Sequence, residues 1–156
     1  MKTLETTRLI LRDWNESDIL CGVYSEKSIR YLMSAKNNYA IILKENNKVI
    51  GTIGINEDAD GNENARNIGV RIIPEYQNRG LMSEALRAVI DNAHMITDTL
   101  SWLCKSTDTR SRHLAKKFGF TYVKTFYNVQ RKSDEEPHDF DYFILNTKGI
   151  ESFTFC

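Results

Sequence analysis

Charge of neither sign predominates in this 156-residue sequence, which has 21 lysine and arginine residues and 21 aspartate and glutamate residues. Without a net charge there is no long-range field to attract nucleic acid or an anionic membrane, so we expect neither as a partner. The sequence also lacks the run of about 18 apolar residues that a membrane-spanning helix needs. Its first residues, MKTLE, do not begin an apolar signal-peptide segment, so we expect a cytoplasmic protein.

Cysteine is scarce as well. Cys21, Cys104 and Cys156 are odd in number and far apart, which fits neither a disulfide framework nor a metal site built on closely spaced cysteines. We expect free thiols and no bound metal.

The length is that of one domain with a substantial core. We expect a single domain over residues 1–147, followed by a tail over residues 148–156. Phe153 and Phe155 in this tail must either pack back onto the domain or contact a partner.

A strand, a basic turn and a helix follow one another between residues 68 and 93. Residues 68–73 are mostly branched and apolar and stop at Pro74, as a strand that leaves its sheet does. After the turn, apolar residues recur every three or four positions on one helical face. They are Leu81, Met82, Ala85, Leu86, Val89, Ile90 and Ala93.

The turn itself has the features of an anion site. The first turn of a helix has N–H groups without partners and the positive end of the helix dipole, which suit a phosphate. Gly80 lets a ligand approach the backbone closely, and Arg79 adds positive charge. An ordinary connection between a strand and a helix has the same features, so these residues alone leave both interpretations open.

Other elements follow from the pattern of apolar residues. Strands are predicted at 4–12, 39–44, 48–55, 65–73, 100–105, 121–131 and 138–147, with two short helical pieces between Asn15 and Asn38. Aromatic residues of the last two strands are predicted to belong to the core. These residues are Phe126, Tyr127, Phe140, Tyr142 and Phe143.

Two polar segments complete this reading. The run Asp58-Ala59-Asp60-Gly61 suggests a calcium loop, but its glycine comes too early and no glutamate closes the loop, so we expect a solvated turn. Asp108 is predicted to cap a helix that ends at Gly119 and whose apolar face holds Leu114, Ala115 and Phe118.

Three of these segments resemble one family. Residues 77–82, Gln-Asn-Arg-Gly-Leu-Met, resemble the acyl-CoA pyrophosphate loop Gln/Arg-x-x-Gly-x-Gly/Ala of the GNAT superfamily of N-acetyltransferases. Residues 108–120 resemble its second signature, Asn-x-x-Ser-x-x-Leu followed by a basic residue and Gly-Phe, with Asp108 in place of asparagine. The string TxRLxLR at residues 6–12, followed by Asp18, is similar to the branch that contains the ribosomal-protein alanine acetyltransferases. The resemblance covers nearly the whole chain.

The resemblance implies an α/β (α+β) fold. Its centre is a mixed, mostly antiparallel sheet of about six to seven strands, splayed in the middle, with helices on both faces and with the 100–105 strand beside the 65–73 strand. It also implies acetyl-CoA as co-substrate, without a metal. The cofactor-binding residues that it implies are Ile72, Gln77, Asn78, Arg79, Gly80, Leu81, Met82, Asp108 and Ser111.

Two of these positions depart from the family pattern. Met82 stands where glycine or alanine is usual and narrows the room beside the pyrophosphate, although it leaves the backbone donors unchanged. An ionised Asp108 can accept a hydrogen bond but cannot donate one, as an asparagine would. A helix cap and a ligand contact are both open roles for Asp108.

The resemblance also implies the reaction, which is direct attack of a primary amine on acetyl-CoA in a ternary complex. Many relatives use a tyrosine acid at the position of Ala115, so we expect Ser111 to assist the departing thiolate, with Tyr142 as a second candidate. A nucleophile made of Cys104 and His113 is not expected, because direct transfer needs no acyl-enzyme.

The general base is less clearly indicated. Relatives often carry a glutamate where this chain has Asn67. Glu57 at the end of the preceding strand is the candidate base, acting through water, and His138 is an alternative.

The acceptor is left open between a protein or peptide N-terminus and a small polar amine. The segment from Asn15 to Asn38 is short compared with the relatives, which predicts an open acceptor side. Two other functions remain possible for the same fold, a non-catalytic acyl-CoA sensor and an interaction module. Either a monomer or a homodimer is compatible with the sequence.

Overall fold

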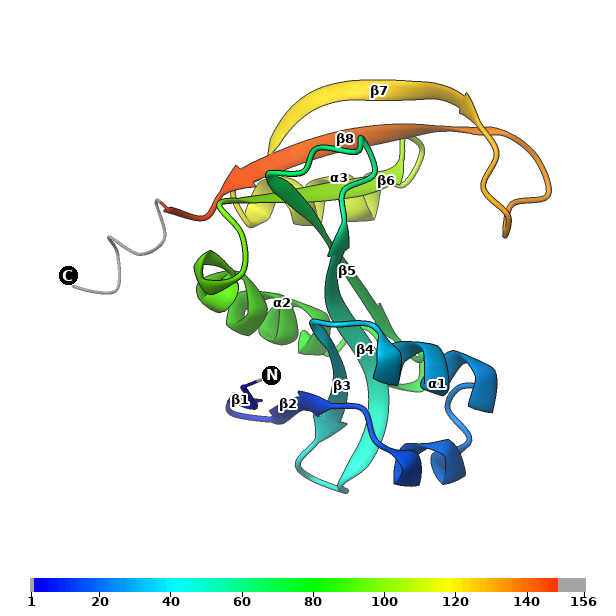
Figure 1. Cartoon of the computed structure of the whole chain (residues 1–156), viewed down its shortest axis with the longest axis vertical. Helices are drawn as coiled ribbons and strands as arrows, with labels where there is room; N and C mark the ends of the chain where they lie inside the picture. Colours follow the sequence, from blue (N-terminus) through cyan, green and yellow to red (C-terminus); the bar gives the residue numbers. More distant parts are fainter. Residues whose placement is uncertain (1, 149–156) are drawn as a thin grey trace. The chain divides into compact units, whose positions relative to one another are not determined.

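The computed structural model describes residues 2–148. It divides into two compact units (Figure 1): the first comprises residues up to 56 together with 68–92, and the second comprises residues 57–67 together with 93 onward. The single domain predicted over residues 1–147 stays a prediction. Phe153 and Phe155 of the predicted tail lie outside the described residues.

The strands and helices agree with those predicted, with one correction: the predicted strand over 4–12 is two strands, because the chain bends at residues 6–8, and the sheet has eight strands in place of the six to seven expected. The strands are β1 (Leu4–Glu5), β2 (Leu9–Asp13), β3 (Asn38–Leu43), β4 (Lys48–Glu57), β5 (Ala65–Ile72), β6 (Thr99–Lys105), β7 (Thr121–Val129) and β8 (His138–Asn146). The helices are η1 (Glu16–Cys21), α1 (Glu26–Ser34), η2 (Pro74–Tyr76), α2 (Leu81–Asn92), η3 (Ala93–Met95) and α3 (Thr109–Lys117), where η marks a 3₁₀ helix. The strands form one eight-stranded sheet in the order β1-β2-β3-β4-β5-β6-β8-β7.

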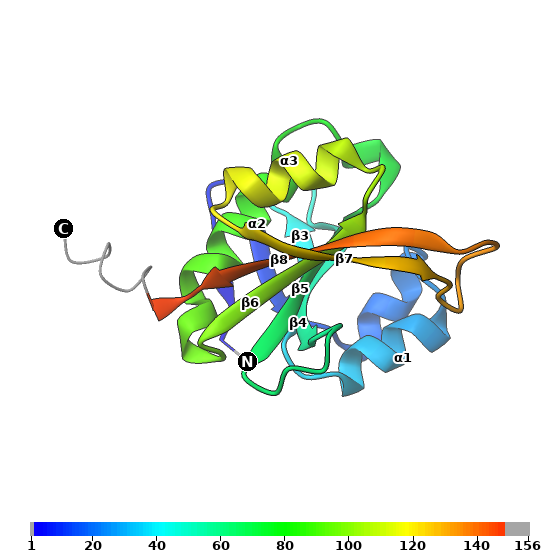
Figure 2. The ribbon, with the colours of Figure 1, turned by 90° about the horizontal axis from the view of Figure 1, so that it is seen from above.

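In the first unit, strands β1 to β3 pair antiparallel in sequence order and β3 pairs antiparallel with β4. The alternation predicted for β2 is confirmed, since Leu9 and Leu11 are fully buried while Ile10 packs on the opposite face, against the cluster around Trp14 and Ile29. Ile29 belongs to α1, whereas α2 contacts β1 and β2. A helix therefore covers each face of this part of the sheet, as Figure 2 shows for α1 and α2.

The short helical pieces of the first unit begin with defined caps. Asn15 caps η1, and the Asp18 carboxylate in turn accepts a hydrogen bond from the Asn15 N–H (2.9 Å). Arg12 of β2 donates two hydrogen bonds to the same carboxylate, at 2.9 and 2.8 Å. Burial favours the neutral acid, but these hydrogen bonds outweigh burial and lower the pKa of Asp18. The contact explains why Arg12 and Asp18 occur together in the N-terminal signature.

The second unit is a smaller sheet with one helix on it. β5 and β6 pair in parallel at Ala65–Asn67, β6 and β8 pair antiparallel, and β7 is the edge strand beyond β8. The predicted neighbourhood of the 65–73 and 100–105 strands is confirmed. Because side chains alternate along a strand, the paired register places two sets of residues on opposite faces. Trp102, Cys104, Asp141 and Phe143 share one face, and Asn67, Ser101, Leu103 and Tyr142 share the other.

The aromatic residues of β7 and β8 are only partly core residues. Phe140, Tyr142 and Phe143 are buried, but Tyr127 is 75% exposed, so the prediction was wrong for this residue. An edge strand has a neighbour on one side only, and two irregularities in its pairing with β8 further expose β7. Between residues 2 and 148, the structure has no helix both long and apolar enough to span a membrane.

Replacing Asp18 tests the contact that holds η1 against β2. Asp18→Asn keeps the side-chain acceptor for the Asn15 N–H but leaves Arg12 without its charged partner, so we expect a loss of about 2 kcal/mol in the free energy of unfolding near neutral pH. The folded-state pKa of Asp18 lies below its usual 3.8, so this stabilisation is present above that value and is lost as the pH falls through the folded-state pKa. Denaturant unfolding at pH 7 and in acid measures both effects.

Asp91→Asn is a matched control because Asp91 pairs with Arg87 on the exposed surface of α2. An exposed pair of this kind contributes less than about 0.5 kcal/mol. Equal losses for the two variants, or a loss for Asp18→Asn that does not shrink in acid, would contradict the structural role of Asp18.

Candidate functional site

The turn predicted between the 65–73 strand and the following helix joins β5 to α2 in the structure. β5 ends at Ile72, η2 follows, and the chain then turns through Asn78 and Gly80, which have φ angles of 62° and 76°. These angles lie in the left-handed region, which glycine adopts without strain and asparagine tolerates. Gln77 holds the turn against the strand, since its Nε2 donates to the Ile72 carbonyl at 2.8 Å.

Helix α2 begins directly at this turn. Its first intrahelical hydrogen bond runs from the Glu84 N–H to the Gly80 carbonyl (3.1 Å), so the N–H groups of the preceding residues have no intrahelical acceptor. Leu81 anchors the helix start in the core with 3% exposure, and Met82 is half-buried. The turn therefore presents backbone donors at the positive end of a twelve-residue helix.

A carboxylate of α2 ties this turn to the N-terminal signature. Glu84 Oε2 accepts hydrogen bonds from Thr6 Oγ1 (2.5 Å) and the Arg8 N–H (2.9 Å), and Oε1 accepts from Arg8 Nε (2.8 Å). Burial favours the neutral acid, but the hydrogen bonds from Thr6 and Arg8 prevail and lower the pKa of Glu84. Arg8 also donates through Nη1 to the carbonyl of Arg79 in the turn (2.9 Å).

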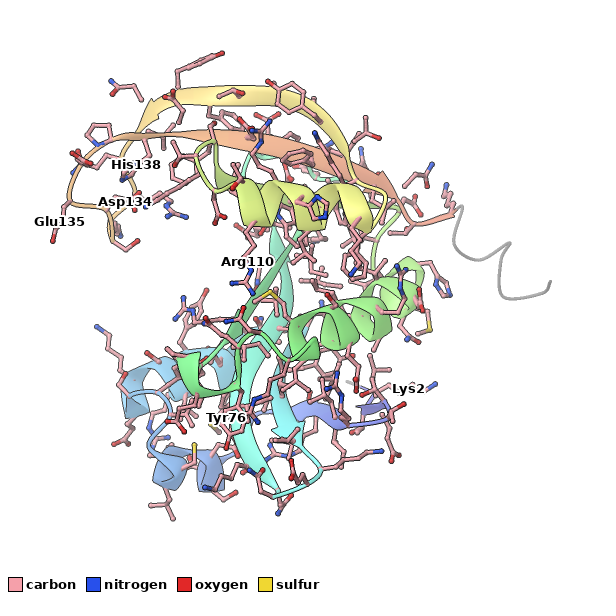
Figure 3. All side chains as sticks on the ribbon, turned by 180° about the vertical axis from the view of Figure 1, so that it is seen from behind. Lys2, Tyr76, Arg110, Asp134, Glu135 and His138 are labelled. Carbon is pink, nitrogen blue, oxygen red and sulfur yellow. The ribbon has the colours of Figure 1, made fainter. Side chains whose placement is uncertain are left out.

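The Arg79 side chain folds back onto η2. Its guanidinium carbon lies 5.3 Å from the ring centre of Tyr76, and Nη2 donates to the Glu75 carbonyl at 3.3 Å. Figure 3 labels Tyr76 at this position. The positively charged guanidinium predicted at Arg79 thus lies next to the turn, against the face of the Tyr76 ring.

In the second unit, Asp108 and Ser111 lie together at the start of α3. The Asp108 carboxylate caps the helix by accepting from the Ser111 N–H at 3.0 Å, so its predicted capping role is confirmed. Ser111 Oγ accepts from Trp102 Nε1 at 3.1 Å. The Trp102 contact occupies an acceptor site of the hydroxyl and leaves its proton available to another acceptor.

Cys104 is the other neighbour of Ser111. Burial raises the pKa of the Cys104 thiol, although a hydrogen bond with Ser111 opposes this shift. A thiol of raised pKa is a poor nucleophile at neutral pH. His113 is exposed on α3.

The opposite face of the same sheet carries a group of polar side chains that sequence reasoning identified only in part. Tyr142 donates to Asp58 Oδ1 at 2.8 Å. Ser101 is fully buried on this face, and neither its hydroxyl nor the Asn67 amide nitrogen has a partner with hydrogen-bond geometry among the described residues. Asn67 and Ser101 are paired positions of β5 and β6.

Ionisation states in this group are well defined. Burial would raise the pKa of Asp58, but the hydrogen bonds that its carboxylate accepts outweigh burial and lower the pKa below 3.8. Burial and, next, the hydrogen bond to Asp58 raise the pKa of Tyr142 to about 12. At neutral pH the pair therefore consists of a carboxylate and a protonated phenol.

The two bases suggested by the sequence lie elsewhere. Glu57, the last residue of β4, is exposed, and it is the next residue, Asp58, that contacts Tyr142. His138 begins β8 beside the β7–β8 turn, where Figure 3 labels it with Asp134 and Glu135. Four residues of strand, about 13 Å, separate His138 from Tyr142.

The segment that suggested a calcium loop folds as a turn around Asp58. Its Oδ2 accepts from the N–H groups of Asp60 (3.0 Å) and Asn62 (3.3 Å), a local pattern typical of aspartate in turns. Lys124 of β7 pairs with Asp60 at 2.6 Å. Over residues 2–148, no three His, Cys, Asp or Glu side chains are grouped so that they could hold a metal.

The short segment before β3 borders a hollow in the first unit. The cavity has a volume of about 410 Å³. Its lining comes from the end of β2, the last turn of α1 and the residues that lead into β3. The lining residues are Asp13, Trp14, Leu32, Met33, Ser34, Ala35, Lys36, Asn37 and Asn38.

Comparison with known proteins adds evidence from sequence and fold. The acetyltransferase (GNAT) domain family matches residues 8–121. An uncharacterized N-acetyltransferase p20 of Bacillus licheniformis is 29% identical, over 58% of this chain and 65% of that protein. The match thus spans slightly less than two thirds of this relative.

Solved structures share the fold. An acetyltransferase (GNAT family) from Bacillus anthracis has a TM-score of 0.77 and 22% identity, covering 94% of this chain and 99% of that one. RimL, a ribosomal L7/L12 alpha-N-protein acetyltransferase in complex with coenzyme A, has a TM-score of 0.72 and 18% identity, covering 93% and 98%. The predicted fold class and family resemblance are confirmed, and the chain belongs to the acetyltransferase (GNAT) domain family.

Proposed function

We propose that this protein is an acetyl-CoA-dependent N-acetyltransferase that acetylates a primary amine, preferably the α-amine of a protein or peptide. The observation that carries the proposal is the turn from Gln77 to Met82, which opens α2 with exposed backbone donors and a left-handed glycine. This arrangement suits the pyrophosphate of an acyl-CoA. The CoA-bound RimL structure of the same fold supports coenzyme A as the ligand.

The predicted cofactor-binding residues contribute in different ways. The backbone from Asn78 to Met82 supplies donors to the phosphates. Gln77 acts by holding the turn to the Ile72 carbonyl, since this is the contact that its amide makes. Asp108 acts through its cap of α3, which fixes the N–H and side chain of Ser111.

Ser111 is proposed as the group that assists the leaving thiolate. In the reaction the amine nitrogen forms a bond to the acetyl carbon, the bond from that carbon to sulfur breaks, and the sulfur gains a negative charge or a proton. The Ser111 hydroxyl accepts from Trp102 and keeps a proton to donate to sulfur.

Asp58 and Tyr142 are proposed to serve the amine side. An amine arrives as an ammonium and must lose a proton before attack, and an ionised carboxylate attracts the ammonium and the water that takes its proton. Asp58 then takes the place that sequence reasoning gave to Glu57, with Glu57 exposed next to it. Tyr142 orients Asp58, because a phenol with a pKa of about 12 is a weak proton donor to a thiolate.

The preference for a protein or peptide N-terminus rests on two observations. The N-terminal signature that resembles the predicted branch is held in place by ion pairs, with Arg8 paired to Glu84 and Arg12 paired to Asp18. RimL, which shares the fold, is named for acting on a ribosomal protein α-amine.

A panel of amines tests the function directly. We expect release of free thiol from acetyl-CoA with N-terminal peptides and slower release with polyamines, amino acids and aminoglycosides. Turnover confined to small amines would overturn the acceptor preference. Binding of CoA without turnover of any amine would favour the alternative of an acyl-CoA sensor, which Asn67 and Ala115 at the usual catalytic positions also favour.

Gly80→Glu tests the phosphate turn. Glutamate brings bulk and negative charge to the helix start, so we expect CoA affinity measured by calorimetry to fall at least a hundredfold. Gly22→Glu is the matched control, because Gly22 also has a positive φ, 70°, and open space around it. A Gly80→Glu variant that binds as the wild type would refute the assignment.

Ser111→Ala tests the acid. We expect kcat to fall roughly ten- to a hundredfold while the dissociation constant for CoA changes little. Thr109→Ala, which alters an exposed hydroxyl on the same helix, controls for changes to α3. If Ser111→Ala turns over at the wild-type rate, Ser111 does not assist the leaving thiolate and has only a structural role in its contact with Trp102.

The pH profile tests Asp58 and Tyr142. Asp58 is ionised above about pH 4 and Tyr142 is protonated below about pH 12, so neither titrates between these limits. With a peptide acceptor, kcat/KM should rise with pH to about 8, the pKa of an α-amine. Tyr142→Phe should lower kcat/KM about tenfold without moving the pH of this inflection. A shifted inflection would show that Tyr142 itself exchanges the proton responsible for it.

A further inference from the structure

The Arg8 side chain connects the N-terminal strands to the phosphate turn through two of its three nitrogens. Nε donates to Glu84 Oε1 at 2.8 Å, and Nη1 donates to the Arg79 carbonyl at 2.9 Å. No residue within the described part of the chain accepts from Nη2. This nitrogen lies 3.4 Å from the position that a Cβ on Gly80 would occupy, so it faces the space beside the glycine at the start of α2.

The neighbouring carboxylate holds Arg8 in this position. Glu84 Oε2 is occupied by Thr6 Oγ1 and by the Arg8 N–H, while Oε1 is occupied by Arg8 Nε. The Arg8 side chain remains 45% exposed and that of Glu84 is 20% exposed. A guanidinium fixed at two nitrogens is a preorganised donor, because little rotamer freedom remains to be lost when the third nitrogen binds.

We propose that Arg8 is a cofactor-binding residue whose Nη2 donates a charge-assisted hydrogen bond to a pyrophosphate oxygen of acyl-CoA. The inference rests on the proposed function and adds to the backbone donors of the turn a residue from the connection between β1 and β2. Arg8 also neutralises Glu84, the carboxylate nearest the helix start, which would otherwise repel a phosphate. Phosphate recognition by a planar, fixed guanidinium is the geometry that arginine serves best.

Calorimetric titration with CoA provides the first measurement. Arg8→Met keeps the length of the apolar stem and removes the guanidinium, and we expect its dissociation constant to rise roughly ten- to a hundredfold, the range for a lost charge-assisted hydrogen bond. Arg30→Met is the charge-matched control from the same unit, since Arg30 pairs with Glu16 and Glu26 on the surface of the first unit. Its affinity should stay within about twofold of the wild type.

Ligand variants separate a phosphate contact from general damage to the turn. With 3′-dephospho-CoA, which keeps the pyrophosphate, Arg8→Met should lose the same factor as with CoA. Pantetheine, which has no phosphate, should inhibit wild type and variant equally. A loss that disappears with 3′-dephospho-CoA, or one that persists with pantetheine, overturns the pyrophosphate contact.

The double variant Arg8→Met/Glu84→Gln separates a direct contact from neutralisation of Glu84. It should remain at least tenfold weaker than wild type, whereas recovery to within twofold would show that Arg8 acts only through Glu84 and would overturn the proposal. If Arg8→Met does not fold in a thermal scan, Arg8→Lys takes its place, with an intermediate loss expected. Wild-type protein that fails to bind CoA would overturn the proposed function itself, while equal binding by wild type and Arg8→Met overturns this inference alone.

Discussion

The Glu84 carboxylate is the group on which the turn from Gln77 to Met82 depends. It accepts three hydrogen bonds from Thr6 and Arg8, and Arg8 in turn holds the Arg79 carbonyl. A backbone turn through two left-handed residues has no regular hydrogen-bonding pattern of its own, so its shape must be fixed from outside. The segment between β1 and β2, about 70 residues earlier in the sequence, supplies that support through Arg8.

The sheet of the second unit separates two kinds of chemistry by its alternation. Ser111 contacts Trp102 on the face covered by α3, while Tyr142 and Asp58 meet on the other face. Each face therefore has a polar group of defined ionisation: a neutral serine hydroxyl that accepts from Trp102 on one face, and a carboxylate kept ionised by its neighbours on the other. A strand is an efficient way to divide such groups, because adjacent residues point to opposite sides without any change in the backbone.

Particular residues show how far sequence reasoning reached. The apolar repeat of α2, the cap at Asp108 and the start of α2 after Gly80 were predicted from spacing alone and are confirmed. The base candidate Glu57 was chosen because it ends a strand, yet its neighbour Asp58 makes the contact with Tyr142. Adjacent residues of a strand point to opposite faces of the sheet. Which of Glu57 and Asp58 faces Tyr142 therefore depends on where β4 ends and the turn begins. The prediction was wrong for Tyr127, because its exposure reflects the edge position of β7.

The sequence by itself determined the elements, the family and the position of the turn before α2, because apolar periodicity, caps and glycine positions are local properties of the chain. Tertiary structure alone decided which polar side chains meet. Nothing in the spacing of Arg8 and Glu84, or of Asp58 and Tyr142, indicates a contact, since each pair is separated by more than 70 residues. Such contacts form when strands distant in sequence become neighbours, and their strength comes from the burial and hydrogen bonding that the packed structure provides.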